Sequence, residues 1–155
     1  MKKIALAAVG VLVAAAAAAQ QGPAKPEDLI KFRQAGYKFM AWNTGRIKAN
    51  VEGNYNKDEV VKAANAIAGI AGSGMGALYA PGTEKSVGGV GTHAKPEIFT
   101  DKEGVAKVAI AFNKEANELA KVAASGDAAA VKLQFGKLVE ACKACHKEYR
   151  VEEKH

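Results

Sequence analysis

The strongest chemical signal in this sequence is a pair of cysteines three residues apart followed at once by a histidine: Cys142, Cys145 and His146. Two thiols at this spacing can each form a thioether to a vinyl group of haem, and the adjoining imidazole can then bind the iron. The chain has only 2 cysteines, and the motif uses both. The motif therefore predicts one covalent haem c, attached through Cys142 and Cys145, with His146 as the axial ligand of the iron.

Other chemistries also use a Cys-x-x-Cys pair. A thioredoxin-like redox motif lies where a strand leads into a helix, and no strand is predicted before this pair. A structural zinc site normally takes four ligands, with a second pair at similar spacing, whereas His93 and His155 are isolated in the sequence. A structural disulfide or a redox pair is the main alternative to haem attachment, ahead of zinc.

The N-terminus predicts export. The first three residues are a short basic start, residues 4–19 form an apolar run dominated by alanine, and the three alanines before Gln20 fit a small-residue cleavage site. The run is too short and too rich in alanine for a membrane span, and no cysteine near the cut could carry a lipid. We therefore expect a cleaved signal peptide over residues 1–19, one mature domain over residues 20–155, a periplasmic location and no membrane anchor.

The charge pattern excludes some classes of partner. Cleavage would remove Lys2 and Lys3 and leave 20 basic against 16 acidic side chains, a net charge near +4. The lysines alternate with glutamates and are not massed with aromatic residues, which is typical of a solvated helical surface. Nucleic-acid binding is therefore not expected. A mildly basic surface does suit weak docking with an acidic periplasmic redox partner.

The hydrophobic periodicity predicts an all-α protein with four long helices. The expected spans are about 26–52, from a cap at Asn56 to about Tyr79, from a capping box that opens at Thr100 to about Gly126, and from a cap at Asp127 to about Glu153. The second and third helices are joined by a glycine-rich loop over residues 80–99, and the other connections are short. This pattern predicts an up-down four-helix bundle.

The cysteine motif lies on the apolar face of the predicted fourth helix. At about 100° per residue, one third of the circumference holds the two thiols and the imidazole together with Val131, Phe135, Leu138, Val139 and Tyr149. We therefore expect both thiols and the imidazole to point into the bundle core. The haem should then be buried, with at most an exposed edge.

One face of the predicted first helix places an arginine among apolar residues. The members of this face are Leu29, Ile30, Arg33, Tyr37, Met40, Thr44, Ile47 and Val51. A buried arginine is costly unless it is paired, and no acidic residue shares the face. A haem propionate is one natural partner for Arg33. The alternative is that the arginine side chain extends along the helix to reach solvent.

A second apolar patch lies on another side of the same predicted helix. It consists of Phe32 and Phe39, with Gly36 between them. Exposed aromatic rings at helical spacing indicate a contact between helices, so we expect a homodimer through the first helix. The alternative is a bundle broader than four helices, in which these rings are internal.

Together these features resemble the class II c-type cytochromes, and most closely the cytochrome c′ family. The resemblance covers essentially the whole mature chain, and its most specific segments are residues 24–28, 32–34, 80–84, 94–98 and 142–150. It implies a five-coordinate, high-spin haem with His146 on one face of the iron and no protein ligand on the other.

The resemblance also implies roles for residues outside the motif. Arg33 resembles the family's propionate partner, and Tyr37, four residues later, falls where the vacant side of the iron is faced in the family. Low-spin relatives have a ligating methionine at that place. Arg150 resembles a basic residue beside the proximal pocket. The sequence departs from the family in the small segment Gly72–Gly76, which leaves the size of the pocket open.

Two other residues on the first helix could in principle fill the sixth position. Met40 lies one turn beyond Tyr37 on the same face, in the distal pocket, although a methionine on a buried face usually packs the core. Tyr37 could bind as a phenolate, but an apolar setting disfavours that charged form. The open site is the main expectation.

An iron with one imidazole ligand and an open position binds small neutral diatomic gases. Tyr37 and Met40 crowd that position and offer little positive charge for an anion, which favours nitric oxide and carbon monoxide over dioxygen. We therefore expect a gas-binding protein with a part in nitric oxide tolerance. A periplasmic electron carrier is the alternative, although an open site suits fast transfer poorly. Enzymatic nitric oxide reduction or peroxidase activity is not expected, because no distal histidine–arginine pair is found.

Overall fold

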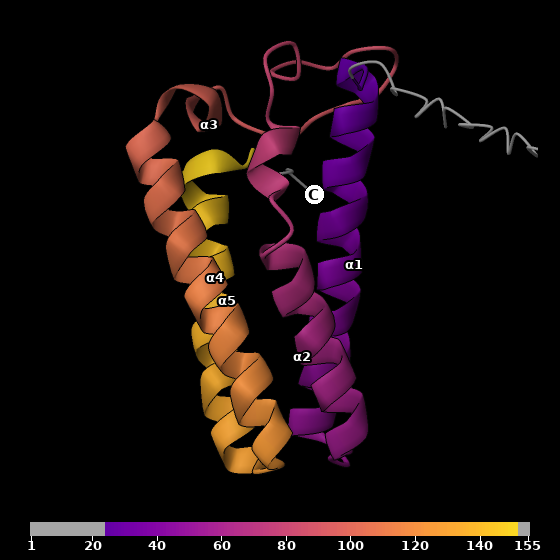
Figure 1. Ribbon diagram of the computed structural model, residues 1–155, viewed down its shortest axis with the longest axis vertical. Coiled ribbons are helices and arrows are strands. Elements are labelled where there is room, and N and C mark those ends of the chain that lie inside the picture. The colour runs from indigo at the N-terminus through magenta and orange to yellow at the C-terminus, as the bar shows by residue number, and fades with distance from the viewer. Residues whose placement is uncertain (1–23, 152–155) are drawn as a thin grey trace, which may run out of the picture.

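The computed structural model describes residues 24–151 as a bundle of four long helices (Figure 1). These helices are α1 (Pro26–Glu52), α2 (Lys57–Ala71), α4 (Lys102–Ser125) and α5 (Ala128–Tyr149). The connection between α2 and α4 contains a 3-10 helix, η1 (Met75–Leu78), and a single turn, α3 (Glu97–Thr100). The all-α four-helix bundle is therefore confirmed, whereas the signal peptide predicted over residues 1–19 lies outside the described residues.

Helices that follow one another in the sequence also pack together, with α1 on α2, α2 on α4 and α4 on α5. The two short connections lie at the lower end of the bundle in Figure 1, and the long connection covers its upper end. None of the helices within residues 24–151 has the length and apolar character needed to cross a bilayer.

The predicted caps fix three of the helix ends. Pro26 occupies the first turn of α1, where its missing N–H costs nothing. The side chain of Asn56 accepts from the backbone N–H of Glu59 at 3.1 Å at the start of α2. The carboxylate of Asp127 accepts from two backbone N–H groups at the start of α5. The expected starts of these helices are confirmed.

The predicted end of the second helix at Tyr79 is wrong. α2 ends at Ala71, and the chain continues through Gly72, Ser73 and Gly74 before η1 begins. Gly74 has φ 84°, a left-handed conformation that glycine adopts without a steric penalty. The small segment Gly72–Gly76, in which the sequence departs from the family, therefore breaks the helix and redirects the chain.

Two other predicted boundaries need correction. Thr100 belongs to α3, and the residue that caps α4 is Asp101, whose carboxylate accepts from the N–H of Gly104 at 2.9 Å. α5 ends at Tyr149, before the predicted boundary near Glu153, which lies outside the described residues. Arg150 is already extended and pairs with Ala94 of the long connection. This pairing stops the helix.

The hydrophobic core fills the lower half of the bundle, which is the half next to the two short connections in Figure 1. The upper half is the one next to the long connection. Its buried members are mostly alanines and branched aliphatic residues, namely Met40, Ile47, Val60, Ala63, Ala64, Ile67, Ala71, Ala116, Leu119, Ala123, Val131, Phe135 and Leu138. On α5 this cluster ends at the level of Cys142, which packs against it from outside. The upper half is built differently, and it contains the predicted site.

Candidate functional site

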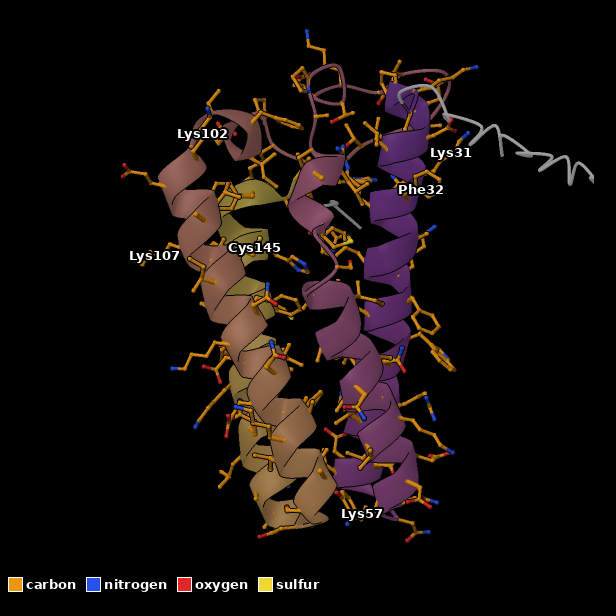
Figure 2. All side chains as sticks on the ribbon, viewed as in Figure 1. Lys31, Phe32, Lys57, Lys102, Lys107 and Cys145 are labelled. Atoms are coloured by element: carbon orange, nitrogen blue, oxygen red, sulfur yellow. The ribbon has the colours of Figure 1, made fainter. Side chains whose placement is uncertain are left out.

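The cysteine motif lies in the last turns of α5, in the upper half of the bundle, where Figure 2 labels Cys145. Cys142 and Cys145 are partly buried, whereas His146 is exposed. The core cluster reaches α5 only as far as Cys142, so the turn that carries His146 lies beyond it, and the inward direction of the imidazole stays a prediction.

The two thiols are not joined to each other. Burial raises the pKa of both, and the neighbouring Cys145 raises that of Cys142 further. Redox-active cysteines depend on a lowered pKa and on a strand that leads into the helix. This pair lies near the end of a 22-residue helix and has neither feature, so the redox alternative loses its support.

Arg150 lies close enough to influence the axial histidine predicted from the motif. Partial burial of the ring, together with the positive charge of Arg150, lowers the pKa of His146. A lowered pKa favours the neutral imidazole, which is the form that binds a metal. Arg150 therefore favours, through its charge, the neutral form of His146 that can bind the iron.

Arg33 is buried, with 3% of its surface exposed, so the alternative in which it reaches solvent is wrong. Its Nη1 donates to Leu78 O at 3.3 Å and to Thr83 Oγ1 at 2.9 Å. Its Nη2 donates to Thr83 O at 3.0 Å and to Thr92 Oγ1 at 2.6 Å. The guanidinium thus fastens the long connection to α1.

These bonds limit what Arg33 can offer to a cofactor. The two terminal nitrogens of a guanidinium carry four hydrogens, and the four bonds to the long connection use all of them. The Nε–H is the donor that makes no hydrogen bond within residues 24–151. The propionate contact stays a prediction, and it would rest on that Nε–H.

Tyr37 lies across from the cysteine motif. Its hydroxyl accepts from the hydroxyl of Tyr79 at 3.3 Å. Burial is the main cause that raises the pKa of both tyrosines, and the thiols of Cys145 and Cys142 raise that of Tyr37 further. Tyr37 is therefore within electrostatic reach of both thiols. Because its pKa is raised, the phenolate alternative is disfavoured at neutral pH.

Met40 is 6% exposed and belongs to the core cluster. This position agrees with the packing role that a methionine on a buried face usually has. Its assignment to the distal pocket stays a prediction.

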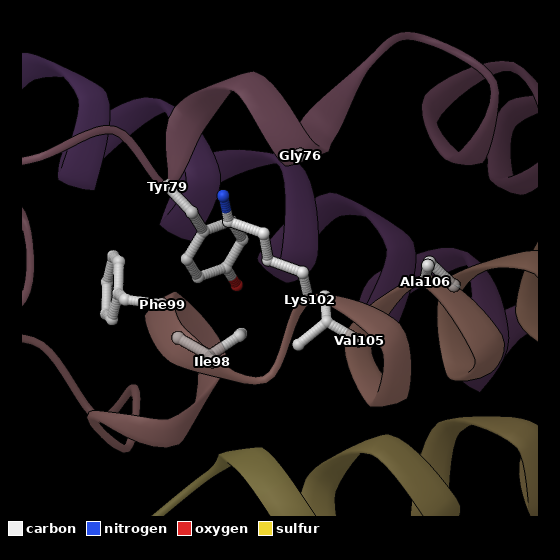
Figure 3. Close-up of a pocket in the computed structure, with 8 residues that line it drawn as sticks. Gly76, Tyr79, Ile98, Phe99, Lys102, Val105 and Ala106 are labelled. Carbon is white, nitrogen blue, oxygen red and sulfur yellow. The ribbon is translucent and has the colours of Figure 1, made fainter.

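Tyr79 is the residue of this site that sequence reasoning missed. With Phe99 it lines an apolar pocket of about 380 Å³, which Figure 3 shows between η1, α3 and the start of α4. The other lining residues are Gly76, Ile98, Lys102, Val105, Ala106 and Ala109. No periodic signal marks Tyr79, because its position depends on the break at residues 72–74.

The residues of the upper half fit a covalently attached haem. Two neutral thiols and an imidazole lie within about one turn of α5, Tyr37 of α1 lies within electrostatic reach of both thiols, and Tyr79, which bonds to Tyr37, lines an apolar pocket. Within residues 24–151, no group of three or more His, Cys, Asp or Glu side chains is arranged to hold a metal ion by itself.

The aromatic patch predicted on α1 remains exposed. Phe32 and Phe39 are 59% and 49% exposed, and Trp42, which the sequence analysis did not include, is 56% exposed. Phe39 stacks on Trp42 with ring centroids 5.4 Å apart, and Arg46 lies over the Trp42 ring. The alternative of a broader bundle is therefore wrong for residues 24–151, because these rings are not internal.

Comparison with known proteins identifies relatives along nearly the whole described chain. The family model described as cytochrome c′ matches residues 28–150. The cytochrome c′ of Rhodocyclus tenuis is 61% identical over 129 residues, which are 83% of this chain and 97% of the relative. That of Allochromatium vinosum is 59% identical over 125 residues, 81% of each chain.

Solved structures share the same architecture. One is a cytochrome c′ with an unusual ligand-controlled dimer dissociation, with 57% identity and a TM-score of 0.83 over 84% of this chain and 99% of that chain. A carbon monoxide-bound variant of the Alcaligenes xylosoxidans cytochrome c′ has 30% identity and a TM-score of 0.74, over 83% of this chain and 98% of that chain. A nitric oxide complex of another variant has 30% identity and a TM-score of 0.75, over 84% and 99%.

Proposed function

The chain belongs to the cytochrome c′ family, and from this premise we propose that it is a periplasmic protein that binds nitric oxide and carbon monoxide and contributes to nitric oxide tolerance. It carries one covalent haem c, as the family does. The bound haem supplies an iron with a position for a diatomic gas. Side chains of this protein would hold the haem and control access to the iron.

The proposed roles follow from where the side chains lie. Cys142 and Cys145 hold the haem covalently, and His146 binds the iron as a neutral imidazole. Arg150 favours that neutral form through its charge. Arg33 contributes its Nε–H to a propionate, while its other donors hold the long connection.

A single observation carries the gas-binding proposal: the side chain facing the motif from α1 is a neutral tyrosine. The hydroxyl of Tyr37 is held by another neutral hydroxyl, that of Tyr79, and neither is available as a charged ligand. A neutral, crowded setting suits uncharged diatomics better than anions. The relatives with bound nitric oxide and carbon monoxide support this assignment.

Electron carriage in the periplasm is the second candidate function. The observation that favours it is the surplus of basic side chains, 20 against 16 acidic ones in residues 20–155, which suits weak docking with an acidic redox partner. Neither the gas-binding function nor electron carriage involves catalytic turnover at the haem. Arg33, the basic side chain against Tyr79, is occupied by the long connection and is not free to assist bond cleavage.

We also propose a homodimer through α1. The exposed rings of Phe32, Phe39 and Trp42 offer an apolar surface on that helix. Tyr37 lies on the same helix, so a ligand that displaces it can act on the dimer contact. A relative described by ligand-controlled dimer dissociation supports this coupling. Sedimentation of the reduced protein with and without carbon monoxide tests it, and an unchanged monomer in both states argues against it.

The decisive experiment is an absorption spectrum of the reduced mature protein before and after addition of carbon monoxide. We expect a high-spin spectrum that changes with the gas. Tyr37→Ala should speed carbon monoxide association by roughly tenfold or more, since each ~1.4 kcal/mol of removed obstruction is worth a factor of ten. Lys38→Ala, an exposed change on the same helix, is the control. Low-spin bands that ignore the gas would favour the electron carrier instead.

A further inference from the structure

We propose that Tyr79 is a positioning residue that holds the hydroxyl of Tyr37 in place at the gas-binding side of the site. The inference rests on the proposed function and deepens it, because it assigns the control of gas access to a pair of residues from different segments. Tyr37 alone would be a loosely held side chain, and Tyr79 is what fixes it.

Tyr79 itself is held from several sides. Its backbone N–H donates to Gly76 O at 3.1 Å, which ends η1. The guanidinium of Arg33 lies 4.7 Å from its ring centroid, and the Phe99 ring meets it edge-on at 5.9 Å. Because Arg33 is itself bonded to Thr83, the ring of Tyr79 rests on a rigid support.

Tyr37 is far less constrained. Tyr37 as a whole residue is 42% exposed, and within residues 24–151 its hydroxyl has one hydrogen bond, the one from the Tyr79 hydroxyl. At 3.3 Å this bond is longer than the usual O–H···O distance of about 2.7–2.8 Å, so it is weak enough for an arriving ligand to break. Burial raises the pKa of both tyrosines, so the bond persists at neutral pH.

The break after α2 makes this arrangement possible. The left-handed turn at Gly74 starts η1, and η1 brings Tyr79 toward α1. The Met75 side chain seats η1 against α1 at Gly36, where an added Cβ would come within 2.9 Å of Met75 Cε. Gly36 and the segment Gly72–Gly74 thus both serve to place Tyr79 beside Tyr37.

The test uses conservative variants of the haem-loaded mature protein. Tyr79→Phe keeps the ring and its contacts with Arg33 but removes the hydroxyl, and Tyr37→Phe removes the same bond from the other side. Each should raise the carbon monoxide association rate by about 2- to 10-fold, the range that one net hydrogen bond allows. The double variant should add little to either single change.

Tyr55→Phe is the matched control. The Tyr55 hydroxyl is buried and is without a hydrogen-bond partner in the described part of the chain, in the connection between α1 and α2. Its removal should leave the association rate unchanged. An equal acceleration in Tyr55→Phe, or fully additive effects of the two site variants, would overturn the proposal.

A second measurement does not depend on gas binding. In protein labelled with ¹³C at the tyrosine rings, Tyr79→Phe should shift and broaden the ring signals of Tyr37, whereas Tyr55→Phe should not. An unmoved Tyr37 signal rejects the positioning role even if the protein binds gas. Failure of the wild-type protein to bind carbon monoxide would instead reject the proposed function, and the NMR result would still decide this inference.

Discussion

The two halves of the bundle are held together by different forces. The lower half is closed by the tight connections at Asn56 and Asp127 and filled by aliphatic side chains such as Ile67 and Leu119, both almost fully buried. Within residues 24–151, the upper half has no comparable aliphatic cluster and is fastened by hydrogen bonds from polar side chains, above all Arg33. The comparison shows that aliphatic packing in the lower half stabilises the fold, whereas the upper half holds the candidate site.

The end of α5 illustrates how the upper half is fastened. The Tyr149 hydroxyl donates to Asp101 Oδ2 at 2.6 Å, which ties the end of α5 to the start of α4. The backbone N–H of Lys95 donates to Tyr149 O at 2.9 Å, and Lys95 Nζ donates to Lys147 O at 2.9 Å. The helix turn that carries His146 is therefore anchored from outside the core.

The largest expected effect is a cavity in the lower half. Leu119→Ala removes a fully buried side chain and should lower the free energy of unfolding by about 2–5 kcal/mol, measured by urea denaturation. Carbon monoxide kinetics should stay unchanged, because the site lies in the other half. Ile110→Ala on the same helix is the control, since Ile110 is 69% exposed and its loss should cost less than about 0.5 kcal/mol. A large kinetic change in Leu119→Ala would contradict the division into halves.

The same substitution should have opposite signs in the two halves. A Cβ added at Gly136 of α5 meets no atom within 4 Å, so Gly136→Ala should stabilise the protein by about 0.5–1 kcal/mol through helix propensity. At Gly104 the added Cβ would collide with the Asp101 carboxylate and the Tyr149 hydroxyl, so Gly104→Ala should destabilise it by about 1–3 kcal/mol. Thermal unfolding measures both, and equal signs would refute the contrast.

The smallest effect concerns pH. The bond from Tyr149 lowers the pKa of Asp101, and the same bond raises the pKa of Tyr149 to about 12. Its stabilisation is present above the ordinary aspartate pKa of about 4 and below the ordinary tyrosine pKa of about 10. It is lost as the pH falls through the lowered pKa of Asp101 or rises through about 12.

Tyr149→Phe should therefore be less stable than the wild type across the neutral range, with a difference that shrinks toward both extremes. Denaturation curves over a pH series measure this difference. In an Asp101→Asn background, this stability difference should no longer decrease at acidic pH. A stability difference that does not vary with pH would show that the hydrogen bond plays no part.

Local chemistry explains what could be predicted from the sequence. The caps at Asn56 and Asp127 and the proline at the start of α1 act within one turn, so their positions can be read directly. The Cys-x-x-Cys-His motif is equally local. By contrast, Arg33 is bonded to Thr83 and Thr92, which are 50 and 59 residues away in an aperiodic segment. The position of Tyr79 could not be predicted, because the left-handed turn at Gly74 changes the direction of the chain before it.

The unequal halves also bear on how the mature protein is assembled. Thioether formation needs both cysteines to be reachable as reduced, unpaired thiols, and in this chain they lie at the upper limit of the core cluster. The lower half can therefore become compact without enclosing them. A compact lower half is therefore compatible with haem attachment at Cys142 and Cys145 before the polar contacts of the upper half form.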